Sequence, residues 1–201
     1  MKPSISQSKY FTKILRHSAE EENIELDKDG FALVDDLLKK SFLNNLSKDD
    51  VKEMVDTCSK KRFKIKYNSS GGLLIAANQG HSIKIHSSLL TPLNLDNIDF
   101  DYIIHGTYYN VLDSIKRAGL SKMNRVHIHF STKLPEDGVI SGMRKSCQVY
   151  VLVDIKKAIN DGYNFYKSEN DVILTEGNKD GYVPPKYICK IMDRKTKREI
   201  D

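Results

Sequence analysis

The chain has 201 residues, 39% of them hydrophobic, which is enough for one large domain or two small ones. Its 32 basic and 27 acidic residues give a net charge of +5, which permits an anionic partner without requiring one. No apolar run approaches the length of a membrane span and no signal-peptide core follows Met1, so we expect no membrane partner and an intracellular site, cytoplasmic or nuclear. The three cysteines are scattered, which argues against a disulfide framework or a structural zinc site.

The first 90 residues predict three helices followed by a β-hairpin. The spacing of apolar residues predicts helices over residues 5–19, 34–42 and 48–58. Ser47 is the expected N-cap of the third helix, with Asp50 at the third helical position. Alternation from Arg62 to Tyr67, a turn at 68–72 and a return over 73–76 predict the hairpin. This order of elements is typical of a winged-helix-like unit.

A linker at Ser87–Asn97 is expected to separate this lobe from a second one of mixed composition. Helices are predicted over Asn110–Ala118, ended by Gly119, and over Ile155–Asn160. The expected strands of the second lobe are Tyr102–Ile104, Val126–Phe130, Val149–Val153, Val172–Leu174 and Tyr187–Met192. We therefore expect an α+β protein with lobes at residues 1–90 and 99–201.

One predicted strand, Arg125–Ser131, carries polar residues on a single face. Side chains alternate along a strand, so Val126, Ile128 and Phe130 would face a core. The opposite face would present Arg125, His127, His129 and Ser131, either to water or to a ligand. The two histidines could bind a metal, but no third ligand is identifiable, and we expect no metal site.

The remaining candidate residues are arginines and histidines beside small residues. No dinucleotide-binding glycine motif, P-loop, zinc-protease motif or nucleophile elbow is present. Each candidate alone has an ordinary interpretation: Arg16-His17 could compensate a helix dipole, and Arg62 could be a surface charge. Because the guanidinium fork suits phosphate, the arginines together suggest a phosphorylated ligand.

The order and wording of these segments resemble the tRNA 2′-phosphotransferase family over nearly the whole chain. The segments that carry the resemblance are Ser8-Lys9, Leu15-Arg16-His17, Asp29-Gly30-Phe31, Lys61-Arg62-Phe63, Asn78-Gln79-Gly80-His81-Ser82, Ile104-His105-Gly106-Thr107, Met123–Ser131, Gly138–Arg144, Asp161-Gly162, Phe165-Tyr166, Val172–Leu174 and Val183-Pro184-Pro185.

The resemblance implies a winged-helix-like RNA-binding lobe and an ADP-ribosyltransferase-like lobe that binds NAD. Family members transfer an internal 2′-phosphate of spliced tRNA to NAD, as the final step of tRNA splicing. The RNA 2′-phosphate attacks the nicotinamide ribose and expels nicotinamide, and the neighbouring ribose hydroxyl then attacks phosphorus. The products are 2′-hydroxyl RNA, nicotinamide and ADP-ribose 1″,2″-cyclic phosphate. NAD is thus a consumed co-substrate, no metal is implied, and we expect a monomer.

Residue by residue, the resemblance implies a catalytic set of Arg16, His17, Arg62 and Arg144. The residues expected at the RNA phosphate are Arg16, His17, Arg62, Gln79 and His81. Those expected at NAD are His105, Gly106, Thr107, Asn124, Arg125, His129, Ser131, Gly138 and Val139. The resemblance also implies that a hydrophobic residue near Val172 stands where many relatives with the ADP-ribosyltransferase fold carry a glutamate that activates an acceptor, and a phosphate acceptor needs no such base.

Two other functions stay open. The chain could be an ADP-ribosyltransferase that acts on phosphorylated nucleic-acid ends and stops after the first step. It could also be a non-catalytic winged-helix protein that binds nucleic acid, for which His105 would be dispensable.

Overall fold

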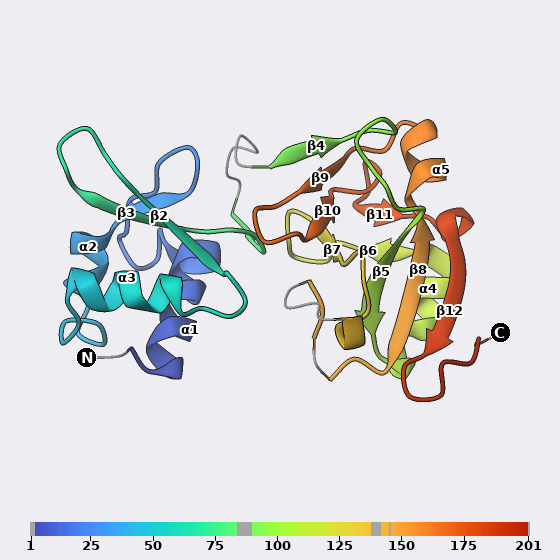
Figure 1. Ribbon diagram of the computed structural model, residues 1–201, viewed down its shortest axis with the longest axis horizontal. Coiled ribbons are helices and arrows are strands. Elements are labelled where there is room, and N and C mark those ends of the chain that lie inside the picture. Colours follow the sequence, from blue (N-terminus) through green and yellow to red (C-terminus); the bar gives the residue numbers. More distant parts are fainter. Residues whose placement is uncertain (1–2, 84–89, 138–141, 145, 201) are drawn as a thin grey trace. The chain divides into compact units, whose positions relative to one another are not determined.

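The computed structural model describes residues 3–83, 90–137, 142–144 and 146–200, apart from the side chain of Glu136. The chain folds into two compact units, Met1–Leu89 and Leu90–Asp201 (Figure 1). Both units combine helices with antiparallel sheets, which confirms the expected α+β class.

The described residues of the first unit form three α-helices and a π-helical turn. They are α1 (Ile5–Lys13), the π-helix Ile14–Ser18, α2 (Val34–Leu38) and α3 (Lys48–Asp56). Ser4 and Gln7 form a capping box at the start of α1, and Ser47 and Asp50 form one at α3, as the sequence predicts for Ser47. The expected second helix is too long, because α2 stops at Leu38 and leaves Phe42 48% exposed in a turn.

A three-stranded antiparallel sheet in the order β1-β3-β2 completes this unit. Its strands are β1 (Phe31–Leu33), β2 (Phe63–Tyr67) and β3 (Leu73–Ala77). The predicted hairpin is present: the Asn68 side chain accepts from the amide of Gly72 at 2.7 Å, and Gly71 adopts a φ of +80° in the turn. Strand β1 was not predicted. The sheet and helices enclose one core that includes Phe11, Leu37, Val51 and Ile75.

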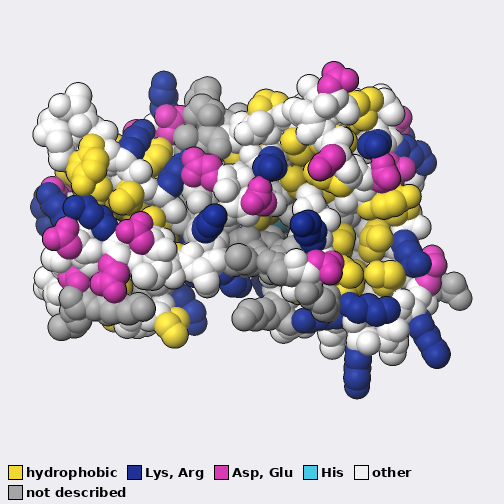
Figure 2. All heavy atoms as spheres, in the orientation of Figure 1, with side chains coloured by type: hydrophobic (Ala, Val, Ile, Leu, Met, Phe, Trp, Pro, Cys, Tyr) yellow, Lys and Arg dark blue, Asp and Glu magenta, His cyan; other side chains and the backbone are white. Residues whose placement is uncertain are grey.

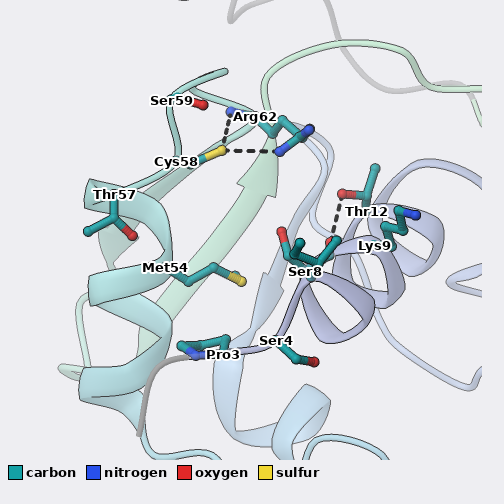
Figure 3. A pocket seen from close by; sticks show the side chains of 11 residues that line it. Pro3, Ser4, Ser8, Lys9, Thr12, Met54, Thr57, Cys58, Ser59 and Arg62 are labelled. Atoms are coloured by element: carbon teal, nitrogen blue, oxygen red, sulfur yellow. Dashed lines mark hydrogen bonds between the residues drawn. The ribbon is translucent and has the colours of Figure 1, made fainter.

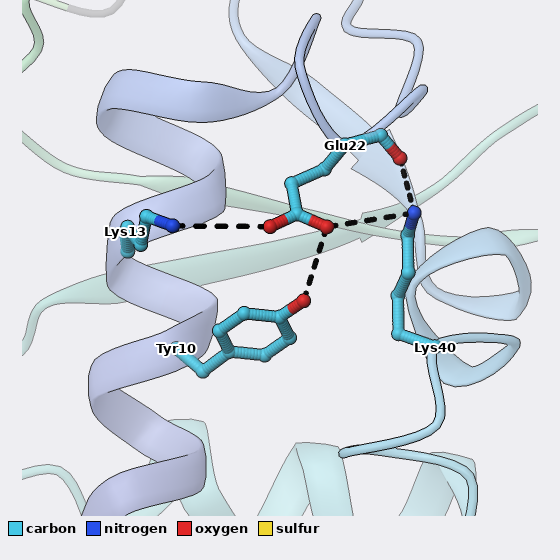
Figure 4. A network of polar contacts seen from close by, with 4 residues as sticks. All are labelled: Tyr10, Lys13, Glu22 and Lys40. Atoms are coloured by element: carbon cyan, nitrogen blue, oxygen red, sulfur yellow. Dashed lines mark hydrogen bonds and ion pairs between the residues drawn. The ribbon is translucent and has the colours of Figure 1, made fainter.

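Glu22 connects segments of the first unit that are distant in sequence (Figure 4). Its carboxylate lies 3.9 Å from the Lys13 ammonium and 3.6 Å from that of Lys40, and it accepts a 3.1 Å bond from the Tyr10 hydroxyl. Lys40 also donates to the Glu22 carbonyl. These contacts tie α1 and the π-helix to the turn after α2, and so help to fix where the π-helix lies.

Two larger sheets organise the second unit. One has the order β12-β8-β5 and the other the order β4-β9-β10-β7, both antiparallel. The strands are β4 (Thr91–Leu93), β5 (Tyr102–Thr107), β7 (Ile128–Phe130), β8 (Val149–Asp154), β9 (Phe165–Lys167), β10 (Ile173–Thr175) and β12 (Ile188–Asp193). A bridge between Ile104 and Ser131 brings β5 beside β7 and so joins the two sheets.

Among the described residues of the second unit, the α-helices are α4 (Leu112–Ala118) and α5 (Ile155–Asn160), and a short pair of strands, β6 (Leu120–Ser121) with β11 (Tyr182–Val183), accompanies the sheets. The bounds of α5 agree with the prediction, and Gly119 ends α4 with a φ of +90°. The core of this unit includes Ile103, Phe130, Val151 and Phe165.

The expected linker at residues 87–97 is wrong in part, since Thr91–Leu93 pairs with β9 as strand β4. Strand β4 lies at the edge of its sheet. Pro92 has no amide proton to donate, which an edge strand tolerates because one of its sides has no neighbouring strand. The expected second lobe, starting at residue 99, therefore omits a strand of the second unit.

Candidate functional site

The π-helix of the first unit presents Arg16 and His17 to the loop after β3. The Ser82 amide donates to the Arg16 carbonyl at 3.0 Å, and the Ser82 hydroxyl lies 3.0 Å from His17 Nδ1. Gly80 adopts a φ of +92°, and a Cβ there would lie 3.2 Å from Arg16 Nη1. The guanidinium thus lies against a glycine because a larger residue would crowd it.

Arg62 is held beside the same loop, directly before β2. The Asn78 amide donates to the Arg62 carbonyl at 2.9 Å, and the Asn78 side chain donates to the Lys61 carbonyl at 2.7 Å. Lys61 has a φ of +43°, which is unfavourable for a residue other than glycine. The Cys58 thiol accepts from the backbone amide and the guanidinium of Arg62 at 3.4 and 3.5 Å. Asn78 therefore stabilises the strained turn that positions Arg62.

All five residues expected at an RNA phosphate lie on segments that these hydrogen bonds join. Arg16 and Arg62 are half-buried and His17 is exposed, whereas His81 is 5% exposed. Gln79 is half-buried. The cluster can offer two permanent positive charges and an imidazole to an anion, which is the arrangement that a phosphate dianion requires.

In the second unit, His105 extends from β5 to β7. Its Nδ1 lies 2.9 Å from the His129 carbonyl oxygen, and because a carbonyl can only accept, Nδ1 carries the proton. Burial lowers the pKa of His105 below 6.5, against the opposing effect of this hydrogen bond, and the nearby Arg125 charge lowers it further. The imidazole is thus neutral at pH 7, with Nε2 left as an acceptor for a hydroxyl group.

Gly106, next along β5, is covered by the segment that contains Arg144. A Cβ at Gly106 would lie 2.3 Å from Met143 Cγ, closer than real Cβ atoms approach a neighbour, and 3.0 Å from Cys147 Sγ, which is a tight contact. A Cβ at Gly142 would lie 3.0 Å from the Phe130 carbonyl oxygen. Glycines at both positions therefore allow Gly142–Arg144 to pack onto β5 and β7.

Arg144 lies near two other polar side chains of this unit. It interacts with the Tyr108 hydroxyl, and together with a 2.7 Å hydrogen bond to Ser146 this lowers the pKa of Tyr108. Burial and the repulsion from Arg144 lower the pKa of Arg125. Two arginines close enough to repel one another are a feature of sites that bind anions, because a bound anion relieves the repulsion.

The expected strand Arg125–Ser131 is wrong over its first half. Only Ile128–Phe130 forms β7, and Arg125 to His127 lie in a bend that follows Met123, which has a φ of +54°. His129 and Ser131 are 7% and 2% exposed, so these two polar side chains are buried, whereas Arg125 is exposed and His127 is half-buried. The Ser131 hydroxyl donates to the Lys133 carbonyl at 2.8 Å, which closes a local turn.

The other residues expected at NAD lie in different surroundings. Thr107 is buried at the end of β5, and Asn124 is exposed in the turn before β7. His127 packs edge-on against Tyr166 with ring centres 6.2 Å apart, and burial lowers its pKa. Val172 is fully buried before β10. Gly138 and Val139 lie outside the described residues.

The structure has a hollow in each unit. A cavity of about 400 Å³ lies between α1 and α3, with Arg62 at one end (Figure 3). A cavity of about 580 Å³ in the second unit is lined by Tyr109, Cys147, Gln148, Asp193, Arg194, Lys195 and Lys197, and none of the described residues expected at NAD lines it.

Charged residues and potential metal ligands were compared over the part of the chain that the structure describes. Lysines and arginines are interspersed with acidic residues over most of the face in Figure 2. Within the described ranges, no group of three or more His, Cys, Asp or Glu side chains could hold a metal ion. The helices of those ranges are also too short or too polar to cross a bilayer.

The sequence reasoning missed several residues that shape these clusters. Tyr108, Met143 and Asn78 were not among the candidates, although Asn78 and Met143 belong to the segments that carry the family resemblance. The π-helix left no signal, because its apolar spacing differs little from that of an α-helix over five residues. Such turns occur often at functional sites, so the π-helix is itself a pointer to Arg16 and His17.

The fold and these clusters define an α+β protein of two units. The first unit carries Arg16 and His17 on its π-helix, and the second carries His105 and Gly106 on strand β5. Comparison with known proteins assigns the family. The model of the RNA 2′-phosphotransferase, Tpt1/KptA family matches residues 2–177, and the chain belongs to this family.

The sequences of individual relatives align with almost the full length of this chain. The chain is 40% identical to tRNA 2′-phosphotransferase 1 of Danio rerio over 186 residues, which cover 91% of this chain and 83% of the relative. It is 39% identical to tRNA 2′-phosphotransferase 1 of Homo sapiens over 197 residues, covering 97% and 78%. A probable RNA 2′-phosphotransferase of Flavobacterium johnsoniae is 37% identical over 185 residues, covering 91% and 94%.

Proposed function

We propose that the protein is an NAD-dependent RNA 2′-phosphotransferase that acts on the internal 2′-phosphate of spliced tRNA. The observation that carries this proposal is the cluster of Arg16, His17 and Arg62 around the Gly80 loop. A phosphate that is both ligand and nucleophile needs positioning and charge neutralisation, and it needs no activated side chain. The names of the relatives support a 2′-phosphotransferase that acts on RNA or tRNA.

The first step would form a bond between an RNA 2′-phosphate oxygen and C1″ of the nicotinamide ribose, and break the bond from C1″ to nicotinamide. Arg16, His17 and Arg62 would hold the phosphate for this attack. The neutral His105, with Nε2 as acceptor, suits a hydrogen bond from a ribose hydroxyl, and this is the feature of the second unit that fits NAD.

In the second step the ribose 2″-hydroxyl would attack phosphorus, and the bond from phosphorus to the RNA 2′-oxygen would break. The RNA oxygen takes up a proton, and ADP-ribose 1″,2″-cyclic phosphate leaves. We assign Arg144 to the charge that develops on the phosphoryl oxygens in this step, since it lies near the Gly106 strand and near a second arginine.

The fold of each unit is part of the proposal. We infer that the first unit is a winged-helix-like RNA-binding lobe, which its three helices and β-hairpin support. We infer that the second is an ADP-ribosyltransferase-like lobe, which its two sheets joined by the Ile104–Ser131 bridge support. Neither reaction step requires a second copy of the chain, so we propose that a monomer is active.

The test is to incubate the purified protein with NAD and an oligonucleotide that bears one internal 2′-phosphate, and to identify the products by mass spectrometry. The proposal predicts 2′-hydroxyl RNA, nicotinamide and ADP-ribose 1″,2″-cyclic phosphate in equal amounts. ADP-ribosylated RNA as the sole product would show an ADP-ribosyltransferase that stops after one step. RNA binding without any NAD consumption would show a non-catalytic binder.

A further inference from the structure

The hollow between α1 and α3 has a composition that the assigned residues do not explain. It holds about 400 Å³, within the range of roughly 300–1,000 Å³ that is usual for ligand pockets. Figure 3 shows side chains from both helices directed into it, with Arg62 above them at one end. Its described lining residues are Pro3, Ser4, Ile5, Ser8, Lys9, Thr12, Met54, Thr57, Cys58, Ser59 and Arg62.

None of these lining residues is acidic, and two of them are cations. Within residues 3–83, several other lysines of the unit have carboxylate partners: Lys13 pairs with Glu22, Lys39 with Asp36 and Lys52 with Asp49. Lys9 and Arg62 have no such partner among those residues. Two neighbouring cations without a counter-ion attract an anion more strongly than the paired lysines do.

The rest of the lining is hydroxyl-rich with an apolar side. Ser4, Ser8, Thr12, Thr57 and Ser59 contribute hydroxyl groups. The Thr12 and Thr57 hydroxyl protons go to backbone carbonyls at 2.9 and 2.7 Å, so their oxygens can still accept from a ligand. Met54 and the 79%-exposed Ile5 provide apolar contact. Hydroxyl acceptors, a cation and apolar atoms together match a ribose, its phosphodiester and a base.

We propose that this hollow binds the RNA nucleotide adjacent to the one that carries the 2′-phosphate, with its phosphodiester on Lys9. The inference rests on the proposed function, because Arg62 belongs both to the phosphate cluster and to the hollow. The adjacent nucleotide is joined covalently to the phosphorylated one, so it must lie beside the group that Arg62 binds. The protein would then recognise an oligonucleotide, and a 2′-phosphorylated mononucleoside would lack part of the contact.

The experiment measures binding by calorimetry without NAD, so that no reaction occurs. The ligands are a trinucleotide with an internal 2′-phosphate and a mononucleoside 2′-phosphate. The variants are Lys9→Gln, which removes the charge, and Thr57→Phe, which fills the hollow from its exposed rim. Lys28→Gln is the matched control, because Lys28 is an exposed lysine of the same unit that does not line the hollow.

We expect each of the two variants to weaken trinucleotide binding about tenfold and to leave mononucleoside binding unchanged, with Lys28→Gln like the wild type. Lys9→Gln should also reduce the slope of log affinity against log salt by about one. Equal loss for both ligands, or no loss for the trinucleotide, would overturn the inference.

The product assay separates this inference from the proposed function. If the wild type transfers the phosphate and the variants bind like the wild type, only the hollow is misassigned. If the wild type transfers no phosphate, the proposed function fails, whatever the length dependence of binding.

Discussion

The two candidate regions use opposite kinds of polar chemistry. In the first unit, Arg16, His17 and Arg62 are exposed or half-buried, and hydrogen bonds to the 78–82 loop hold the backbones of Arg16 and Arg62 and the ring of His17. In the second unit, His105 is neutral and has its Nδ1 proton committed to a backbone carbonyl, and Gly106 is packed against Met143.

This difference matches the charges of the two proposed ligands. A phosphate dianion is bound best by groups that remain cationic at every physiological pH, and water around the arginines keeps their desolvation cost small. A ribose hydroxyl needs a neutral acceptor in a fixed direction, which a half-buried imidazole with an assigned proton provides. Arg144 and Arg125 are exceptions in the second unit, since both are exposed cations.

Replacing Arg144 should have the largest effect on the reaction rate. Arg144→Ala should slow the second step about 100- to 1,000-fold, as is typical when a group that stabilises a transition-state oxyanion is lost. The first step should be slowed much less, so ADP-ribosylated RNA should accumulate in single-turnover reactions. Arg117→Ala, another exposed arginine of this unit, is the control and should resemble the wild type. An equal slowing of both steps would contradict the assigned role.

Arg62→Lys tests whether geometry or charge matters in the first unit. A lysine keeps the charge but cannot form two parallel hydrogen bonds, so phosphate transfer should fall about 10- to 100-fold. The measurement is kcat/KM with a 2′-phosphorylated oligonucleotide, and Arg62→Ala shows the loss when the charge is also removed. Activity near that of the wild type would mean that Arg62 acts only as a general positive charge.

Gly106→Ala tests the close packing of the second unit. The added Cβ would lie 2.3 Å from Met143 Cγ, so the variant should lose about 1–3 kcal/mol of unfolding free energy in denaturant titrations. Adding Met143→Ala removes the clash and should restore part of that loss. If the double variant is no more stable than Gly106→Ala, the clash is elsewhere.

The smallest effect concerns pH. The folded-state pKa of His105 lies below the value of 6.5 for an unperturbed histidine, so the unfolded chain binds the proton more readily. The contribution of the neutral His105 to the free energy of unfolding is complete above pH 6.5, and it is lost as the pH falls through the lower folded-state pKa. Each pKa unit of depression corresponds to about 1.4 kcal/mol.

Denaturant titrations at pH 7.5 and pH 5.5 measure this loss. His105→Asn keeps a donor for the His129 carbonyl and removes the titration, so its stability should change less between the two pH values. The pKa of His127 is also lowered by burial, so His105→Asn should still lose some unfolding free energy at pH 5.5. An identical pH dependence in variant and wild type would mean that His105 is not the responsible group.

Local signals in the sequence predicted much of the fold. Ser47 and Asp50 form the expected cap of α3, Ile155–Asn160 forms α5, and Gly119 ends α4. These features depend on neighbouring residues alone, which is why propensity and capping rules identify them. Strand β4 could not be predicted in this way, because Pro92 argues against a strand unless the strand is known to lie at the edge of a sheet.

The candidate site was predictable only in part. The motifs named Arg16, His17, Arg62 and His105, but alternation along Arg125–Ser131 could not reveal that His129 and Ser131 are buried. Whether a polar side chain is buried depends on partners distant in sequence, here the Ile104–Ser131 bridge between β5 and β7. The packing of Met143 on Gly106 is a tertiary contact of the same kind.

A paired binding measurement can show whether the first unit binds the RNA and the second unit binds NAD. NAD and a 2′-phosphorylated oligonucleotide are titrated separately into the wild type, Arg62→Ala and His105→Ala. We predict that Arg62→Ala weakens only the binding of RNA, and that His105→Ala weakens only the binding of NAD. Either variant weakening both ligands equally, or a wild type that does not bind NAD, would contradict the account.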